Sequence, residues 1–322
     1  MTTDETNHDD TNGAVSADMN DDMGAGGTRC GFVAVIGAPN AGKSTLVNLL
    51  VGAKVSIVTH KVQTTRTRVM GVAIRDKSQV VFIDTPGIFR PKRRLDRAMV
   101  GAAWMGVDEA DQTVFLIDSA AGLNDENKAI LNGLVERKAK AVLVLNKIDL
   151  VKREKLLELA AQLNDSGVFT DTFMISALKG HGAADLMAHL AASVPPGPWM
   201  FPEDQLSDMP QMLLAAEVTR EKLYLNVHQE LPYATTVETE LWEPTADGGV
   251  KIEQVIYVAR ETQKAIILGK GGLRVKAIGK AAREELMEML ECPVHLYLFV
   301  KVRERWQDDP ARYRVWNLDF NA

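Results

Sequence analysis

The sequence predicts an α/β domain, with a mostly parallel sheet and helices on both faces, followed by a smaller α+β domain. Continuous apolar runs of strand length alternate with helical patterns as far as Leu190, as in a parallel sheet that is buried on both sides. The segment Pro195–Pro198 then ends this pattern, and later strands alternate between apolar and polar residues. A length of 322 residues fits two domains of ordinary size.

The strands of the first domain are expected at short apolar runs, most of which end beside a polar motif. These runs are Phe32–Ile36, Val80–Ile83, Thr113–Ile117, Ala141–Leu145 and Thr172–Ile175. Helical patterns lie between or after them, at Thr45–Leu50, Glu126–Arg137, Lys152–Leu163 and Leu186–Leu190. This alternation predicts parallel strands joined by crossover helices.

The second domain is expected to follow the order helix, strand, strand, helix, helix, strand. The corresponding segments are Gln211–Glu230, Thr235–Leu241, Val250–Val258, Glu261–Leu268, Leu273–Leu290 and Val294–Val302. In the last of these, apolar residues alternate with His295, Tyr297, Phe299 and Lys301, which predicts a strand with one buried face.

Composition divides the chain into five parts. Residues 1–28 hold seven acidic residues and no Lys or Arg, and they have almost nothing to bury, so we expect a disordered acidic tail. The first domain should occupy residues 29–197, a stiff proline-containing linker 198–210, the second domain 211–305 and a C-terminal tail 306–322.

Charge is distributed unevenly along the chain. The net charge is −6, but residues 260–283 contain seven Lys and Arg side chains. Because the charge of a domain matters more than the total, the second domain remains a candidate for binding nucleic acid.

Several classes of protein are excluded by composition. Hydrophobic residues make up 46% of the chain and charged residues 25%, as in soluble globular proteins. The two cysteines form no metal-spaced cluster, which argues against a zinc site or a disulfide framework. No apolar run approaches the ~20 residues of a membrane span, and the acidic N-terminus is unlike a secretory signal. We therefore expect a cytosolic protein.

A phosphate-binding loop is predicted where the first strand meets the first helix. The run there fits G-x-x-x-x-G-K-S, whose backbone N–H groups surround phosphate oxygens at a helix N-terminus. Lys43 should reach the β- and γ-phosphates, and the Ser44 hydroxyl should bind Mg²⁺. The candidate site comprises Gly37, Ala38, Pro39, Asn40, Ala41, Gly42, Lys43 and Ser44.

A second motif ends the next predicted strand. Asp84 stands where a carboxylate would hold Mg²⁺ through a water, and Gly87 would offer a backbone N–H to the γ-phosphate. The motif and the residue after it are Asp84, Thr85, Pro86, Gly87 and Ile88. Alone, such a sequence is often only a turn, but its place after a strand and behind a phosphate loop favours the site.

Between these motifs lies the basic polar segment Lys61–Arg68. A sensor of the γ-phosphate needs a hydroxyl here to complete the Mg²⁺ shell. Thr65 is the first candidate and Thr64 its competitor. The alternative is a solvated basic loop.

Two further motifs predict the base. Asn146, Lys147 and Asp149 follow a strand, and the Asp149 carboxylate would accept hydrogen bonds from the ring N–H and the amino group of guanine. Adenine has no such pair of donors, so the carboxylate would stay unpaired and the substrate should be GTP. Ser176 and Ala177, after the last strand, would place a backbone N–H near the guanine oxygen.

A glycine-rich junction in the second domain indicates RNA binding. A G-x-x-G loop between two helices lets the backbone and a lysine approach phosphates of a single strand. The candidate contacts are Gly269, Lys270, Gly271, Gly272, Arg274 and Lys276. The loop alone is only a common helix junction, but the element order, the basic residues and the aromatics Tyr257, Tyr297 and Phe299 favour RNA.

Together these motifs resemble the Era family, bacterial GTPases of the TrmE-Era-EngA-like class with a C-terminal type II KH domain. The likeness spans residues 29 to 305 and rests on GAPNAGKS, QTTRT at 63–67, DTPG, NKID, SAL at 176–178 and ILGKGG at 267–272. The resemblance implies a P-loop GTPase domain that binds GTP or GDP with Mg²⁺ and hydrolyses GTP to GDP and phosphate. It assigns the catalytic roles to Lys43, Asn40, Thr65 and Gly87.

The resemblance also implies partners and location. It implies binding to 16S ribosomal RNA near its 3′ end, a role in assembly of the 30S subunit, and peripheral association with the inner face of the cell membrane. We expect a monomer. A membrane-associated signalling module acting on a protein partner is the alternative, and the basic segment Arg90–Arg94 suits either reading or a plain solvated loop.

One position departs from the Ras-like pattern. Ile88 stands where a Gln would orient the attacking water, and its side chain makes no hydrogen bond. Relatives of Era share this replacement, and several use a potassium ion held partly by the residue that corresponds to Asn40. We therefore predict slow intrinsic hydrolysis that K⁺ stimulates.

Overall fold

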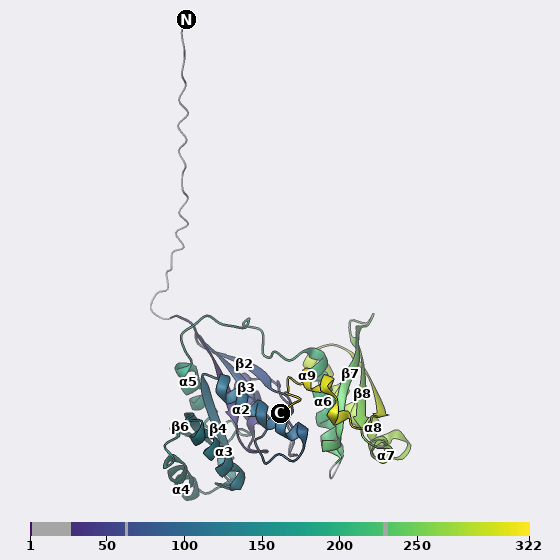
Figure 1. The fold of residues 1–322 in the computed structure, drawn as a ribbon. Coiled ribbons are helices and arrows are strands. Elements are labelled where there is room, and N and C mark those ends of the chain that lie inside the picture. Colours follow the sequence, from purple (N-terminus) through teal and green to yellow (C-terminus); the bar gives the residue numbers. More distant parts are fainter. Residues whose placement is uncertain (2–26, 62–63, 228–230) are drawn as a thin grey trace.

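The computed structural model describes residues 1, 27–61, 64–227 and 231–322, which form two domains lying side by side (Figure 1). The predicted acidic tail, apart from residues 1, 27 and 28, lies outside the described residues, as do Gln63 and the last three residues of the helix predicted at 211–230.

The first domain is built on a six-stranded sheet in the order β2-β3-β1-β4-β5-β6. All neighbouring strands run parallel except β2, which is antiparallel to β3. The strands are β1 Arg29–Ile36, β2 Val69–Arg75, β3 Ser78–Asp84, β4 Gln112–Asp118, β5 Ala141–Asn146 and β6 Phe169–Met174. The five predicted strands are present, and β2 is an additional edge strand.

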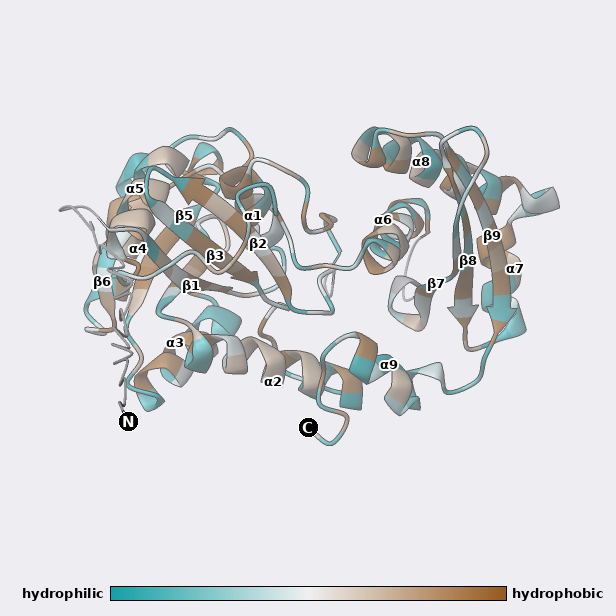
Figure 2. Cartoon of the chain, turned by 90° about the horizontal axis from the view of Figure 1, so that it is seen from above, coloured by the Kyte–Doolittle hydropathy of each residue, from teal (hydrophilic) through white to brown (hydrophobic). Residues whose placement is uncertain are grey.

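Helices cover both faces of this sheet. One core cluster joins the sheet to α1 and α5, and a second joins its other face to α2, α3 and α4. The helices are α1 Lys43–Val51, α2 Arg94–Glu109, α3 Asp125–Glu136, α4 Arg153–Asn164 and α5 Ala183–Ser193, with the 3-10 turn η1 at Ile148–Leu150. Figure 2 shows hydrophobic residues concentrated along the strands. The predicted fold class of this domain is confirmed.

The second domain has a three-stranded sheet, β7-β8-β9, with helices packed on one face. Its elements are α6 Gln211–Asn226, η2 Pro232–Ala234, β7 Thr235–Pro244, β8 Val250–Val258, α7 Glu261–Leu268, η3 Lys270–Gly272, α8 Leu273–Leu290 and β9 Val294–Val302. The predicted element order is confirmed. No helix within the described residues is long and apolar enough to cross a membrane.

Residues after 305, expected to form a tail, are folded against both domains. They contain η4 Trp306–Asp308 and α9 Pro310–Val315, whose N-terminus is capped by the Asp309 side chain. Their aromatic side chains form a core cluster with α2, and α2 and α9 lie next to each other in Figure 2. The physical reason is burial: Trp306, Tyr313 and Trp316 are each at most 5% exposed.

The linker between the domains lies along the open edge of the first sheet. The backbone N–H of Val72 in β2 donates to the carbonyl of Leu206 (2.9 Å), and that of Met70 donates to the Asp208 carboxylate (3.1 Å). Nearer the start of the linker, the side-chain oxygen of the buried Gln79 accepts hydrogen bonds from the backbone N–H groups of Met200 and Phe201. The linker is therefore held to the first domain by main-chain groups and by the Asp208 side chain.

Candidate nucleotide and nucleic-acid sites

The predicted phosphate loop leaves β1 and turns into α1 at Lys43. Asn40 and Gly42 both have left-handed backbones, with φ of 62° and 99°. A Cβ at Gly42 would lie 2.4 Å from Nδ2 of Asn146, so glycine is required for this close approach. The loop thus curves around the N-terminus of α1, where backbone N–H groups bind anions.

The Lys43 ammonium is enclosed by this loop. Its Nζ donates to the carbonyl oxygens of Gly37 (3.1 Å) and Ala38 (3.0 Å), and only 6% of the residue is exposed. Burial lowers the pKa of Lys43 to about 8, although the charges of Asp84 and Glu126 oppose the shift. Burial removes water from the Lys43 ammonium, and the negative charge of a phosphate bound at the loop would compensate for that loss.

Oxygen atoms suited to Mg²⁺ gather beside Lys43. The Ser44 hydroxyl lies 2.9 Å from that of Thr65 and donates to Oδ2 of Asp84 at 2.7 Å. Thr65 Oγ1 is 3.4 Å from the same carboxylate oxygen. Thr64, the competitor for this role, instead shares a hydrogen bond of 2.6 Å with Thr59. The geometry favours Thr65.

Asp84 itself fits the role of a carboxylate behind a hydrated cation. It is fully buried, and its Oδ1 has no hydrogen-bond partner among the described residues. Burial raises the pKa of Asp84, and hydrogen bonds from Ser56 and Ser44 oppose this. Mg²⁺ prefers oxygen ligands and keeps several waters, so one carboxylate and two hydroxyls are a suitable set. The described residues hold no cluster of three His, Cys, Asp or Glu side chains that would form a closed metal cage.

The segment after β3 packs directly on the phosphate loop. A Cβ at Gly87 would lie 3.0 Å from Pro39, and the backbone N–H of Ile88 donates to the Gly37 carbonyl (3.1 Å). The Ile88 side chain is buried in a core cluster with Ala38. Gly87 therefore lies beside the phosphate loop, and Ile88 offers an apolar side chain instead of a group that orients water.

The predicted base-binding residues come together at the ends of β5 and β6. Asn146 donates to the Ala41 carbonyl (2.8 Å) and accepts from the backbone N–H of Ala177 (2.9 Å), tying three loops together. The pKa of Asp149 is lowered, first by a hydrogen bond from Ser176 and then by Lys179, whose Nζ is 3.6 Å away. Asp149 therefore stays a carboxylate, the form that accepts two hydrogen bonds.

Two contributors to this site were not predicted. Asp118, the last residue of β4, accepts from Lys147 Nζ at 2.7 Å and so orients that side chain. Ser56 donates to Asp84 at 2.6 Å. Asp118 could have been found from the sequence, because it stands at the end of a strand, as the other site residues do. Ser56 belongs to no motif that would have indicated it.

The glycine-rich junction of the second domain has the backbone that only glycine adopts readily. Gly269, Gly271 and Gly272 all have positive φ, between 59° and 77°. Lys270 and Lys276 are exposed, whereas Arg274 is half-buried and donates to the Ile266 carbonyl. A cavity of about 850 Å³ beside this junction is lined by Arg274 and by other arginines from both domains: Arg93, Arg260 and Arg305. A basic cavity of this kind suits a nucleic-acid strand.

The aromatic residues that supported an RNA groove belong to the sheet of the second domain. Tyr297 and Phe299 alternate along β9 with the core-facing residues, so they lie on the sheet face opposite α6 and α8. Tyr257 is 9% exposed and donates to Glu240 (2.9 Å). Tyr297 and Phe299 lie on the face that the alternation left unburied, and a part for these aromatic residues in binding RNA stays a prediction.

Comparisons with known proteins match both domains. The family model described as a 50S ribosome-binding GTPase matches residues 32–147, and the KH domain model matches residues 230–307. The GTPase Era of Rhizobium meliloti is 61% identical over 308 residues, covering 95% of this chain and 98% of that protein. The GTPase Era of Agrobacterium fabrum is 62% identical over 293 residues, covering 91% and 92%. This chain belongs to the Era family of GTPases.

Solved structures of Era proteins share the arrangement described above. A variant of Era from Aquifex aeolicus, bound to GDP and AlF4⁻, has a TM-score of 0.85 and 39% identity, covering 90% of this chain and 99% of that one. An Era complex with MgGDPNP and nucleotides 1506–1542 of 16S ribosomal RNA gives the same TM-score and identity, covering 90% and 98%. The chain is accordingly a GTPase with a C-terminal KH domain, as the sequence predicted.

Proposed function

We propose that this chain is a GTP-dependent switch that binds 16S ribosomal RNA near its 3′ end and assists assembly of the 30S ribosomal subunit. One observation carries the proposal: residues 64–67 bring Thr65 to the candidate Mg²⁺ site, and Arg66 and the nearby Lys61 contact the KH domain. A segment shared by both sites links nucleotide state to the RNA surface. The Era complex with 16S nucleotides supports this choice of RNA.

In the proposed GTP site, each group has a separate task. Lys43 neutralises the β- and γ-phosphates, Ser44 and Thr65 bind Mg²⁺, Asp84 binds it through a water, and Gly87 donates its N–H to the γ-phosphate. The other proposed contacts are Gly37, Ala38, Pro39, Asn40, Ala41 and Gly42 for the phosphates, Thr85, Pro86 and Ile88 beside them, and Asn146, Lys147, Asp149, Ser176 and Ala177 for guanine.

Slow hydrolysis with K⁺ stimulation belongs to the same proposal. Asn40 is exposed in the phosphate loop, and its left-handed backbone is one that Asn tolerates. Hydrolysis by wild type and by Asn40→Ala should be compared in K⁺ and in Na⁺. We expect the variant to lose the K⁺ stimulation; an unchanged K⁺ dependence would remove Asn40 from this role.

For RNA, we propose that phosphates contact the backbone of three glycines and three basic side chains. The glycines are Gly269, Gly271 and Gly272, and the side chains are Lys270, Arg274 and Lys276.

We also propose the domain limits 29–197 and 211–305, a monomer, and a cytoplasmic location with peripheral contact at the inner face of the membrane. Light scattering tests the monomer, and flotation with anionic vesicles tests the membrane contact.

The deciding experiment is to cross-link RNA to the protein in its GTP and GDP states and to sequence it. We expect enrichment of the 3′ end of 16S RNA, with a difference between the two states. Lys270→Glu should lose this enrichment, whereas Lys280→Glu, an equal charge change further along α8, should lose much less. Protein partners without enriched RNA would favour the signalling module instead, and RNA binding retained in Lys270→Glu would move the groove away from the loop.

A further inference from the structure

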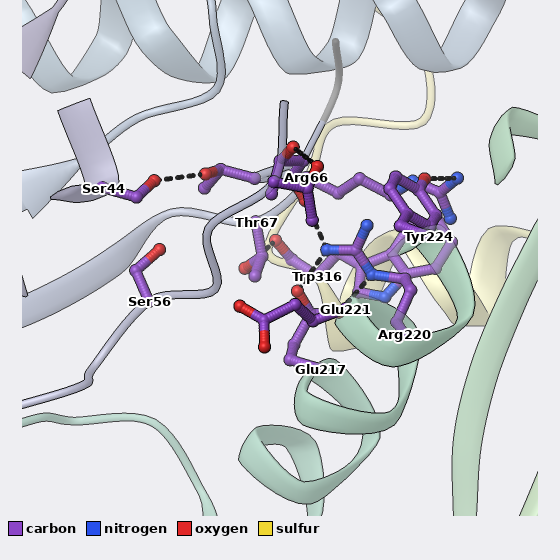
Figure 3. Close-up of polar contacts among 12 residues, drawn as sticks. Ser44, Ser56, Arg66, Thr67, Glu217, Arg220, Glu221, Tyr224 and Trp316 are labelled. Carbon is purple, nitrogen blue, oxygen red and sulfur yellow. Dashed lines mark hydrogen bonds and ion pairs between the residues drawn. The ribbon is translucent and has the colours of Figure 1, made fainter. Parts of the chain in front are cut away.

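The segment that carries Thr65 is held by the KH domain at several points (Figure 3). Lys61 Nζ donates to main-chain carbonyls at the end of α6, and the Arg66 guanidinium donates to the hydroxyl of Tyr224 and the carbonyl of Thr235, both at 2.8 Å. The Thr67 hydroxyl donates to the Trp316 carbonyl at 3.0 Å. Residues on both sides of Thr65 are therefore fixed by the second domain.

Arg220, on α6, holds the residue directly before Thr65. Its Nη2 donates to the Thr64 carbonyl, and its Nε donates to Glu217 Oε1 at 2.8 Å. The same Nη2 reaches the other oxygen of Glu217, so the carboxylate holds the guanidinium at two points. Arg220 is 1% exposed, and its guanidinium lies 5.0 Å from the ring centre of Tyr224. Glu217 and Tyr224 therefore fix the direction in which the Arg220 guanidinium points toward Thr64.

The Arg220 guanidinium stays protonated in this position. Burial lowers its pKa, but the Glu217 carboxylate and Tyr224 more than offset that effect, so the pKa lies above its ordinary value. A charged donor makes a stronger hydrogen bond than a neutral one.

The contact reaches the candidate metal site through one peptide unit. The Thr64 carbonyl and the Thr65 N–H belong to the same planar group, so fixing the carbonyl also fixes the start of Thr65. The Thr65 hydroxyl in turn lies 2.9 Å from Ser44. Arg220 is therefore connected to the Mg²⁺ site without touching the nucleotide.

We propose that Arg220 is a positioning residue for GTP hydrolysis, supplied by the KH domain. It holds the Thr64–Thr65 peptide so that the Thr65 hydroxyl meets Mg²⁺ when the γ-phosphate is bound. The inference rests on the proposed role of Thr65. Because a γ-phosphate sensor matters for GTP and not for GDP, losing Arg220 should affect the two nucleotides differently.

A matched control comes from the same domain interface. Lys54 of the first domain, whose side chain is 29% exposed, pairs with Glu221 and Glu285 of the second domain, and its hydrogen bonds among the described residues go to these two carboxylates. Lys54→Ala removes a contact between the domains and leaves the hold on Thr64 in place. It separates domain docking in general from the positioning of Thr65.

The test uses the full chain without RNA. Single-turnover GTP hydrolysis is measured with Mg²⁺, alongside the affinities for fluorescent GDP and a non-hydrolysable GTP analogue. For Arg220→Ala we expect hydrolysis to fall about tenfold or more, the analogue to bind more weakly, and GDP affinity to stay within about twofold. Arg220→Lys should be intermediate, because a single ammonium replaces the fork. Lys54→Ala should stay within about twofold in every assay.

Three results would overturn the proposal: hydrolysis at the wild-type rate in Arg220→Ala, an equal loss in Lys54→Ala, or a parallel loss of GDP binding in both Arg220→Ala and Glu217→Gln. The last variant keeps Arg220 and replaces its carboxylate partner by an amide with only one accepting oxygen, so it weakens the hold on the guanidinium even if Arg220→Ala folds poorly. RNA binding by the wild type is measured separately. If the RNA proposal failed, the hydrolysis assay would therefore still test the role of Arg220.

Discussion

The buried ammonium of Lys43 predicts how nucleotide affinity depends on pH. In the free protein its pKa is about 8 instead of 10.5. The phosphates of GDP would favour the charged form and return the pKa of Lys43 toward its ordinary range. The free protein therefore loses this proton as the pH rises through about 8, and GDP must restore it on binding.

The size of the effect follows from the pKa shift. At about pH 7 Lys43 is charged before and after binding, so the pH has little influence. At about pH 9 roughly nine in ten free molecules carry a neutral Lys43, and the affinity for GDP should be about tenfold lower than at pH 7. Binding near pH 8 should take up about half a proton.

Isothermal titration calorimetry in buffers of different ionisation enthalpy measures both quantities. Because guanine begins to lose its ring proton at the upper end of this range, the affinities are compared with those of a control variant at the same pH. Lys43→Ala is the control: it should bind weakly at every pH and take up no proton. A wild-type affinity that is flat between about pH 7 and pH 9 would refute the reasoning, since it would mean that the free protein keeps Lys43 charged.

Three other changes test separate parts of the structure. Gly42→Ala should abolish GDP binding and lower the free energy of unfolding by about 1–3 kcal/mol, because its Cβ would lie 2.4 Å from Asn146 and its φ is 99°; thermal unfolding with and without GDP measures both. Trp316→Ala should cost about 3–5 kcal/mol in urea unfolding, whereas its neighbour Val315, 63% exposed, should lose less than about 0.5 kcal/mol on change to Ala. Asp149→Asn should weaken GTP binding about 100-fold or more and improve binding of xanthosine triphosphate, which offers an acceptor where guanine has an amine; equal affinity of the variant for GTP would remove Asp149 from the base site.

The nucleotide site was largely predictable because its chemistry depends on short local motifs. Parallel strands place their carboxyl ends at one edge of the sheet, so motifs after β1, β3, β5 and β6 had to meet there. The sequence left Thr64 open beside Thr65, and only the structure distinguishes them, because the Thr65 hydroxyl faces Ser44 and that of Thr64 faces Thr59. Ser56 was out of reach of this reasoning, because a lone serine in an irregular segment resembles many others.

The contacts between the domains were not predictable from local patterns. Helix α2 buries Leu95 and Met99 against Trp306 and Trp316, which lie about two hundred residues later in the chain. Hydrophobic spacing shows that a helix has a face to bury and does not name its partner.

The main-chain pairing of the linker with β2 has a consequence for protein solubility. An edge strand with free N–H and C=O groups is a template for pairing with other chains, and β2 is the edge of its sheet. Leu206 and Asp208 occupy part of that edge. A GTPase fragment cut at residue 197 would expose it, whereas a fragment that extends through residue 210 would keep its own cover against aggregation.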